Sequence, residues 1–260
     1  MFTDMTDSSS THNFKLILQY DGADYHGSQL QVGVRTIQGV LEEALEKVLG
    51  VKTRIHASGR TDAGVHALGQ VVHFFADSDT APEQLIGRLN DLLPEDIRIL
   101  SAEEVPATFH SRYGATSKVY RYTILNSKIN GRYRATSAYV FPAKLDLDRM
   151  RKAAEYLVGT HDFSAFGVNP GREVKSPVKT IKRLELRQQG NYICIEVEAD
   201  GFLYKMVRSI VGTLVKVGVG KTEPEEMPAI LESKDRCRAG ATAPPQGLCL
   251  VEVKYPPDKT

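Results

Sequence analysis

The sequence predicts an α+β protein built from two ferredoxin-like (RRM-like) halves, each with the element order βαββαβ. Apolar residues alternate with polar ones in short segments typical of strands, and they recur every three to four positions in longer segments typical of helices. The same order of six segments occurs twice along the 260 residues. We expect the antiparallel sheets of the halves to form one central sheet, with helices on one side and a cleft for the functional site between the halves.

In the first half, the segment FKLILQY alternates as a strand. The next apolar residues have helical spacing, with Thr36 before them and Gly50 after them as start and stop signals. Thr80 and Glu83 form a plausible capping box for a second, short helix that ends near DLLP. The strands of this half are expected at 14–20, 52–58, 70–76 and 96–105.

The second half opens with the strand SKVYRYTILN (117–126), which places Tyr120, Tyr122 and Ile124 on one face. Asp146 is the expected N-cap of a helix over 147–158. The segments 178–187 and 192–199 are predicted to form a hairpin around QQGN, followed by a helix over 203–215 and a closing strand at 247–253.

These elements predict the domain organisation. Residues 1–13 are expected to be a disordered lead, 14–108 an N-terminal α+β domain and 109–260 a C-terminal α+β domain. Function should concentrate in the long connections 126–139, 160–177 and 218–246.

Composition places the chain among soluble globular proteins of the cytoplasm. Hydrophobic residues make up 42% and charged residues 25%, and there is no apolar run long enough to span a membrane. The start of the chain lacks the basic and apolar regions of a secretory signal. Three widely spaced cysteines fit a reducing compartment and support neither a disulfide framework nor a zinc site.

Charge is unevenly distributed although the net charge is only +1. No acid occurs between Val105 and Leu145, where there are seven basic residues, and the stretch 171–187 has six basic residues against two acids. A local positive surface attracts a polyanion whatever the net charge, so nucleic acid is a candidate partner. A simple solvated basic face is the alternative.

The segment ASGRTDAGVHA (57–67) combines small residues with an arginine and an aspartate. Its GxxxxG spacing is not a phosphate-binding loop of the Walker type, because Val65 and His66 follow where Lys and Ser or Thr are needed. His56, His66 and His73 match no metal-ligand spacing, and we expect core or hydrogen-bonding roles for them.

The segment GRTDAGVHA (59–67) resembles the catalytic motif of the tRNA pseudouridine synthase A (TruA) family. Five further segments resemble that family's other blocks in the same order: YDGADYHGSQLQ (20–31), FHSRYGATSKVYRY (109–122), GTHDFSAF (159–166), DGFLYKMVRSIVGTL (200–214) and APPQGLCLVEVKY (243–255). One departure is Ser28, which stands where the family commonly has tryptophan. The departure puts local packing or an RNA contact near that loop in doubt, but not the reaction.

The resemblance implies an isomerase that converts uridine to pseudouridine in the anticodon arm of tRNA, at positions 38, 39 or 40, without a cofactor or metal. It assigns Asp62 as the nucleophile, Arg208 as the partner that keeps this carboxylate ionised, and Tyr120 as the aromatic residue on the flipped base. An Asx-turn at Asp62, a surface arginine at Arg208 and a plain strand aromatic at Tyr120 are the structural alternatives.

Other residues are expected to bind the RNA. Arg60 would fill the vacated stack or hold the backbone, Leu248 would pack on the base, and the basic stretches 112–144 and 171–187 would contact phosphates. Gly212 indicates close packing near the site or a helix–sheet contact. His66 is expected to make a structural hydrogen bond.

The family also implies a homodimer with one tRNA contacting both subunits. A non-catalytic RNA-binding or RNA-chaperone protein of the same fold is the alternative function.

Overall fold

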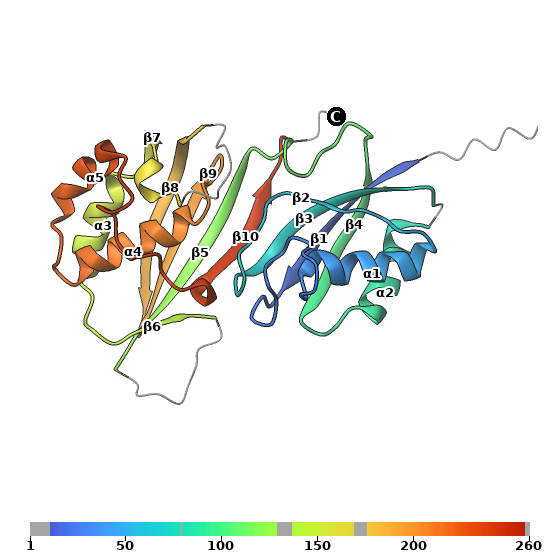
Figure 1. Ribbon diagram of the computed structural model, residues 1–260, viewed down its shortest axis with the longest axis horizontal. Coiled ribbons are helices and arrows are strands. Elements are labelled where there is room, and N and C mark those ends of the chain that lie inside the picture. Colours follow the sequence, from blue (N-terminus) through green and yellow to red (C-terminus); the bar gives the residue numbers. More distant parts are fainter. Residues whose placement is uncertain (1–10, 79, 129–136, 169–175, 258–260) are drawn as a thin grey trace, which may run out of the picture.

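The computed structural model describes residues 11–78, 80–128, 137–168 and 176–257. Its first half has the predicted order of elements, which Figure 1 shows in blue to green. These elements are β1 (His12–Tyr20), α1 (Ile37–Leu49), β2 (His56–Ala57), β3 (His66–Ala76), α2 (Pro82–Leu92) and β4 (Ile97–Val105).

The second half contains the six predicted elements and three additional short ones. The predicted set is β5 (Ser117–Asn126), α3 (Leu147–Glu155), β8 (Val178–Gln189), β9 (Tyr192–Ala199), α4 (Met206–Gly218) and β10 (Leu248–Lys254). The additional elements are β6 (Tyr139–Phe141), β7 (Gly159–Asp162) and α5 (Met227–Ser233). Single 3₁₀ turns cover Ser164–Phe166, Pro224–Glu226 and Pro245–Gly247.

The strands form one continuous, mostly antiparallel sheet in the order β4-β1-β3-β10-β5-β9-β8-β7, with β2 beside β3 and β6 beside β5. The halves meet where β10 pairs in parallel with β3, Cys249 opposite His66 and Leu250 opposite Ala67. Gly69 makes this approach possible, because a Cβ there would overlap with the carbonyl oxygen of Val251. The last strand of the chain therefore joins the two halves.

Both groups of helices cover the same face of this sheet. Cross-strand partners form a row across six strands on that face: Tyr20, Ala67, Leu250, Tyr120, Val197 and Leu184. The first five are buried in one apolar core that also contains the inner faces of α1, α2, α3 and α4. The two groups of helices lie toward opposite ends of the long sheet (Figure 1), which confirms the predicted fold class and leaves the middle of this face for a cleft.

Three of the predicted helix caps are confirmed and one is wrong. The Thr36 side chain accepts from the Gly39 N–H, and Gly50 adopts the left-handed conformation that ends α1. Asp146 accepts from two backbone N–H groups at the start of α3. Thr80, however, does not cap α2: its hydroxyl pairs with Ser78, and the helix starts at Pro82, whose fixed φ suits a first helical position.

Strand limits also differ from prediction. β1 begins at His12, so the expected lead 1–13 overlaps the strand, and residues 1–10 lie outside the described residues. Only His56–Ala57 of the expected strand 52–58 pairs with the sheet. Nearby the Ile55 N–H bonds to Glu42 of α1, so a side chain replaces a strand partner there. β9 has the predicted limits.

Within the described part of the chain, no helix is both long and apolar enough to cross a membrane. All three cysteines are unpaired.

Candidate active site

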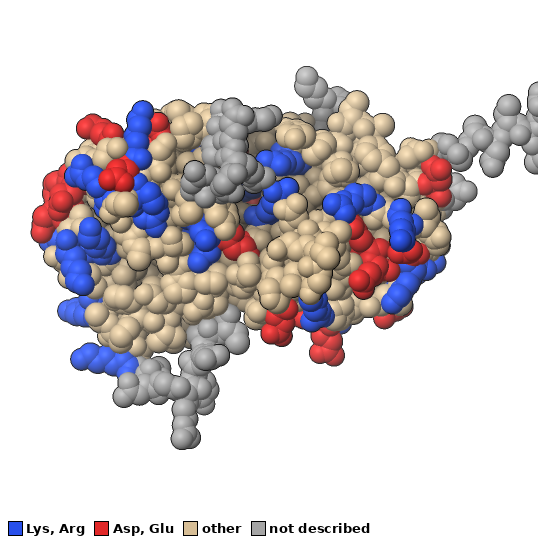
Figure 2. Space-filling model, viewed as in Figure 1, with Lys and Arg blue, Asp and Glu red and all other residues tan. Residues whose placement is uncertain are grey.

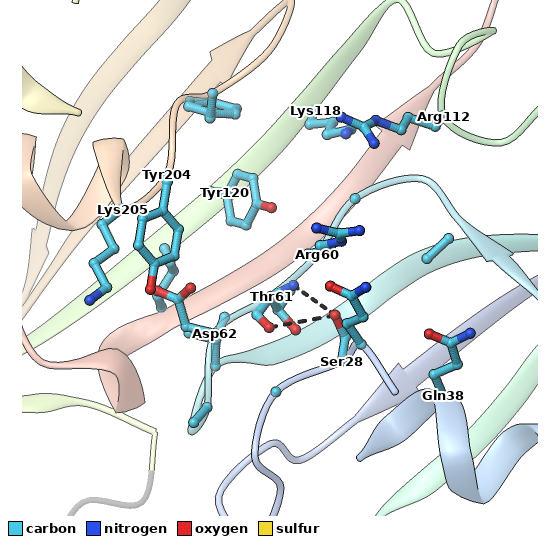
Figure 3. A pocket seen from close by; sticks show the side chains of 18 of the residues that line it. Ser28, Gln38, Arg60, Thr61, Asp62, Arg112, Lys118, Tyr120, Tyr204 and Lys205 are labelled. Atoms are coloured by element: carbon cyan, nitrogen blue, oxygen red, sulfur yellow. Dashed lines mark hydrogen bonds between the residues drawn. The ribbon is translucent and has the colours of Figure 1, made fainter. Parts of the chain in front are cut away.

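A cavity of about 1010 Å³ lies between the two halves on the helix-covered face of the sheet. It contains all five residues assigned from the sequence: Arg60, Asp62, Tyr120, Arg208 and Leu248. Figure 3 shows side chains from the 59–62 loop, from β5 and from the start of α4 converging on this space. The fold thus brings the predicted site residues of the two halves to one cavity.

The loop between β2 and β3 carries Asp62 and is fixed by its neighbours. Ser28 holds the adjacent Thr61 at two points: its Oγ accepts from the Thr61 N–H at 2.8 Å, and its own N–H donates to the Thr61 carbonyl at 3.1 Å. Gly27 lies against the same carbonyl in a left-handed conformation, where a side chain would be strained. Position 28 therefore lies closer to the site than expected, since it directly supports the residue before Asp62.

A buried hydrogen-bond network also holds the loop that carries Asp62. Gln70 accepts from the Ser58 hydroxyl at 2.6 Å and donates to the Gly59 carbonyl at 3.0 Å. Tyr20 pairs with the Thr61 hydroxyl at 2.8 Å, and burial raises the pKa of its phenol to about 12. Fully satisfied buried networks of this kind restrict the loop to one conformation.

Asp62 forms an ion pair with Arg208, whose Nη1 lies 2.6 Å from the carboxylate Oδ2. The side chains are 23% and 11% exposed, so the pair is largely removed from water while the carboxylate still reaches the cavity. A short, charge-assisted contact of this kind fixes the orientation of the carboxylate.

Arg208 is itself held by the segment that precedes β10. Its Nε donates to the Ala243 carbonyl at 2.7 Å, and the Ala243 N–H donates to the Arg208 carbonyl at 3.0 Å. Gly212, one turn further along α4, lets this segment approach, because a Cβ there would overlap with the Ala241 carbonyl oxygen. The close packing expected at Gly212 is therefore present, against residues 240–241 and not against the sheet.

Tyr120 extends from β5 toward the cavity, as Figure 3 shows. Its ring is buried and packs edge-to-face on Phe202, with 5.1 Å between the ring centroids. Burial raises the pKa of the phenol well above its ordinary range, so the group is neutral at physiological pH. The phenol can stack, donate a hydrogen bond or relay a proton, but it is not a phenolate base.

Leu248 also lines the cavity, at the first position of β10. Its cross-strand partner is Tyr122, while Leu250 is opposite Tyr120. The Tyr122 hydroxyl donates to the Pro244 carbonyl at 2.8 Å and its ring is fully buried, so Tyr122 packs within the core.

The charge in the cavity is strongly positive. Among the described residues that line it, Asp62 is the one acid, and it already pairs with Arg208. Five other cations line the same space: Arg54, Arg60, Arg112, Lys118 and Lys205. In Figure 2, Lys and Arg side chains lie around the middle of the face, between the two groups of helices.

The predicted basic stretches are divided between the two faces of the sheet. Arg112 and Lys118 line the cavity, whereas Arg121 alternates to the opposite face and pairs with Glu196 at 3.2 Å. Arg183 and Arg187 of the second stretch are paired with glutamates. Arg132, Arg134 and the residues 171–175 lie outside the described residues.

His66 and His73 have structural surroundings, whereas His56 is exposed and lines the cavity. His66 Nδ1 lies 3.0 Å from the Asp21 carboxylate and 3.3 Å from the Gly22 N, so it contacts the β1–α1 loop. His73 is buried and stacks on His56 at 5.0 Å. No three His, Cys, Asp or Glu side chains of the described residues form a group that could hold a metal ion.

Comparison with known proteins decides the family. The family model for tRNA pseudouridine synthase matches residues 16–114 and 153–256. The chain belongs to this family. Its relatives include tRNA pseudouridine synthase A of Acetivibrio thermocellus, 46% identical over 94% of this chain and 99% of the relative. The enzyme of the same name from Methylacidiphilum infernorum is 43% identical over 95% of this chain and 96% of the relative.

As a member of the pseudouridine synthase family, the protein is an isomerase that converts uridine to pseudouridine. A solved Cbf5-Nop10-Gar1 complex matches 91% of this chain and 57% of that chain, with a TM-score of 0.37 and 11% identity. The family assignment depends on the sequence relatives alone.

Several residues of the synthase site were not found from the sequence. Ser28, Tyr20 and Gln70 support the loop through contacts between segments distant in the chain, which no local pattern reveals. The position of Lys118 in the sequence does indicate that it faces the site, since it stands two positions before Tyr120 on the same face of β5.

Proposed function

We propose that the protein isomerises uridine to pseudouridine in the anticodon arm of tRNA, at positions 38, 39 or 40, with Asp62 as the nucleophile. The observation that supports this most strongly is the Asp62–Arg208 pair, since Asp62 is the one acid among the described residues that line an otherwise cationic cavity. A polyanionic substrate fits the cations, and the carboxylate fits the anomeric carbon of a ribose.

In the proposed reaction the target nucleotide leaves the stack and enters the cavity. Asp62 Oδ attacks C1′ while the bond from C1′ to N1 breaks, and the Arg208 guanidinium stabilises the carboxylate before and after attack. The detached base turns between Tyr120 and Leu248, and C5 bonds to C1′ as the bond from Asp62 to C1′ breaks and frees the carboxylate. The C5 proton is then lost while N1 gains one. Nothing is consumed, so no cofactor enters the balance.

Arg60 is proposed to contact the RNA at the position that the flipped nucleotide leaves. It is exposed, lines the cavity and stands two residues before Asp62 on the same loop. A side chain that occupies the vacated space lowers the cost of unstacking the base.

The experiment for this function uses unmodified tRNA with uridines at 38, 39 and 40. After incubation with the protein, pseudouridine is mapped by carbodiimide adduct formation and primer extension. We expect product at one or more of these positions and none in a tRNA with cytidine there. Product only elsewhere in the tRNA would contradict the proposed target.

We further propose that the protein acts as a cytoplasmic homodimer and that one tRNA contacts both subunits. The three unpaired cysteines suit a reducing compartment. Sedimentation equilibrium with and without tRNA tests the assembly, with one tRNA per two chains as the expected result. A complex of one chain and one tRNA at micromolar concentration would contradict it.

A further inference from the structure

Two basic side chains stand together in the cavity, across Tyr120 from Asp62 (Figure 3). Lys118 comes from β5, and Arg112 comes from the connection between β4 and β5. Both line the cavity, and Figure 3 shows their side chains next to each other. The charge of Arg112 acts on the Lys118 ammonium, so the two like charges lie close together.

Neither of these cations has an acidic partner among the described residues. The Lys118 ammonium donates to the Ser58 carbonyl at 2.6 Å, and the Arg112 guanidinium lies 5.8 Å from the ring centroid of Tyr113. Burial and the charge of Arg112 together lower the pKa of Lys118 to about 8. Lys118 thus lies in surroundings that penalise its charge, and an anion bound between the two groups would relieve that penalty.

The other cations of the cavity have different neighbours. Arg54 pairs with Glu42, Arg208 pairs with Asp62, and the Lys205 ammonium lies 4.8 Å from the ring centroid of Tyr204. Arg112 and Lys118 are distinguished from these by being adjacent to each other without a carboxylate.

We propose that Arg112 and Lys118 form a binding site for one phosphate group of the RNA backbone, adjacent to the nucleotide whose base lies on Tyr120. This inference rests on the proposed function. An arginine fork and a lysine point charge together suit a phosphate, which offers several acceptor oxygens. Lys118 and Tyr120 are two residues apart on one face of the strand, a distance of about 7 Å. The protein can therefore hold a backbone phosphate at Lys118 and the adjacent nucleotide's base on Tyr120 at the same time.

Lys118 also connects this phosphate site to the catalytic loop. Its ammonium holds the carbonyl of Ser58, four residues before Asp62, while its strand carries Tyr120. A phosphate bound there is positioned relative to both the loop and the aromatic ring. The site would therefore set the register of the RNA in the cavity.

Proton uptake gives the site a distinct signature. Because phosphate favours the charged ammonium, binding should raise the pKa of Lys118 from about 8 back toward the ordinary value for lysine. RNA affinity should then fall as the pH rises above about 8, and Lys118→Met should lose this dependence.

The test pairs protein variants with uncharged backbone linkages. Anticodon stem-loop RNAs carry a methylphosphonate in place of one phosphate, on the 5′ or the 3′ side of the target uridine, and Kd is measured by filter binding at constant salt. Wild type should lose about tenfold in affinity for one of the two RNAs. Arg151→Gln, a matched exposed arginine on α3 that pairs with Asp148, should lose the same factor.

For Arg112→Gln, that same methylphosphonate should cost clearly less than tenfold, because one of the two charges that the phosphate would meet is already absent. Arg112 is exposed, so this variant tests the site even if Lys118→Met destabilises the fold. If the methylphosphonate weakens binding to Arg112→Gln by the same tenfold as it does for wild type, the two changes are additive. That result would overturn the proposed phosphate site. Pseudouridine is assayed on the unmodified RNA in parallel: absence of product contradicts the proposed function, whereas product with additive losses contradicts the phosphate site alone.

Discussion

At the scale of single residues, Arg208 does two things at once that a lysine cannot do. It pairs with Asp62 through Nη1 and holds the Ala243 carbonyl through Nε. We predict that Arg208→Lys lowers the single-turnover rate of pseudouridine formation about 100-fold. Rapid quench of enzyme in excess over tRNA measures this rate.

Arg149 provides the matched control for that variant. It likewise holds one carbonyl, of Thr222, and one carboxylate, of Glu223, but it lies away from the cavity. Arg149→Lys should leave the rate within about twofold of wild type. Equal losses in the two variants would show that Arg208 acts through general stability and not at the site.

Gly212 offers a second prediction for a single residue. Gly212→Ala places a Cβ against the Ala241 carbonyl oxygen and should destabilise the fold by about 1–3 kcal/mol. Gly87 lies in the middle of α2 with nothing within 4 Å of a Cβ, so Gly87→Ala should stabilise by about 0.5–1 kcal/mol. Urea unfolding of both variants measures the difference. A neutral Gly212→Ala would refute the close approach.

At the scale of elements, the histidine cluster makes stability depend on pH. Burial, with the charges of His110 and His56, lowers the pKa of His73 to about 4. Between pH 6.5 and 4 the unfolded chain therefore binds more protons than the folded one, and stability falls as the pH falls. The shift corresponds to about 3 kcal/mol across this interval, since each pKa unit is worth about 1.4 kcal/mol.

Unfolding by urea at a series of pH values measures this dependence. His73→Gln removes the titrating group, so its stability should vary with pH less than that of wild type between pH 6.5 and 4. Identical slopes for the two proteins would contradict the role assigned to His73.

Local signals in the sequence predicted most elements but not the contacts between them. The caps of α1 at Thr36 and Gly50 and the limits of β9 could be predicted because residues close in the chain determine them. The start of α2 was wrong because Pro82 fixes the first helical position and Thr80 bonds to Ser78 instead. α5 was missed because seven residues are too few for a clear period.

In the site, too, individual residues could be predicted but the contacts between distant segments could not. Asp62, Tyr120 and Arg208 were assigned by motif resemblance, and the structure brings all three to one cavity. The support from Ser28 and Gln70 could not be predicted, because it depends on pairing between segments distant in the chain. The parallel pairing of β10 with β3, which joins the two halves, had no local signal either.

At the scale of the whole molecule, the cavity collects cations from both halves. Arg54 and Arg60 come from the first half, and Lys118 and Lys205 from the second. If RNA binding neutralises about four phosphates, affinity should fall about 100-fold between about 50 and 200 mM salt. Filter binding over a salt series measures the slope. Affinity that is independent of salt would exclude the cavity cations as the docking surface.

The central claim, that Asp62 performs the chemistry in this cavity, is tested most directly by tritium release. The tRNA carries tritium at C5 of uridine, and C5 loses that atom when it bonds to C1′. Wild type should release tritium, while Asp62→Asn should bind the same tRNA with similar Kd and release none above background. Release by Asp62→Asn at the wild-type rate would contradict the role of Asp62 and with it the account of the site.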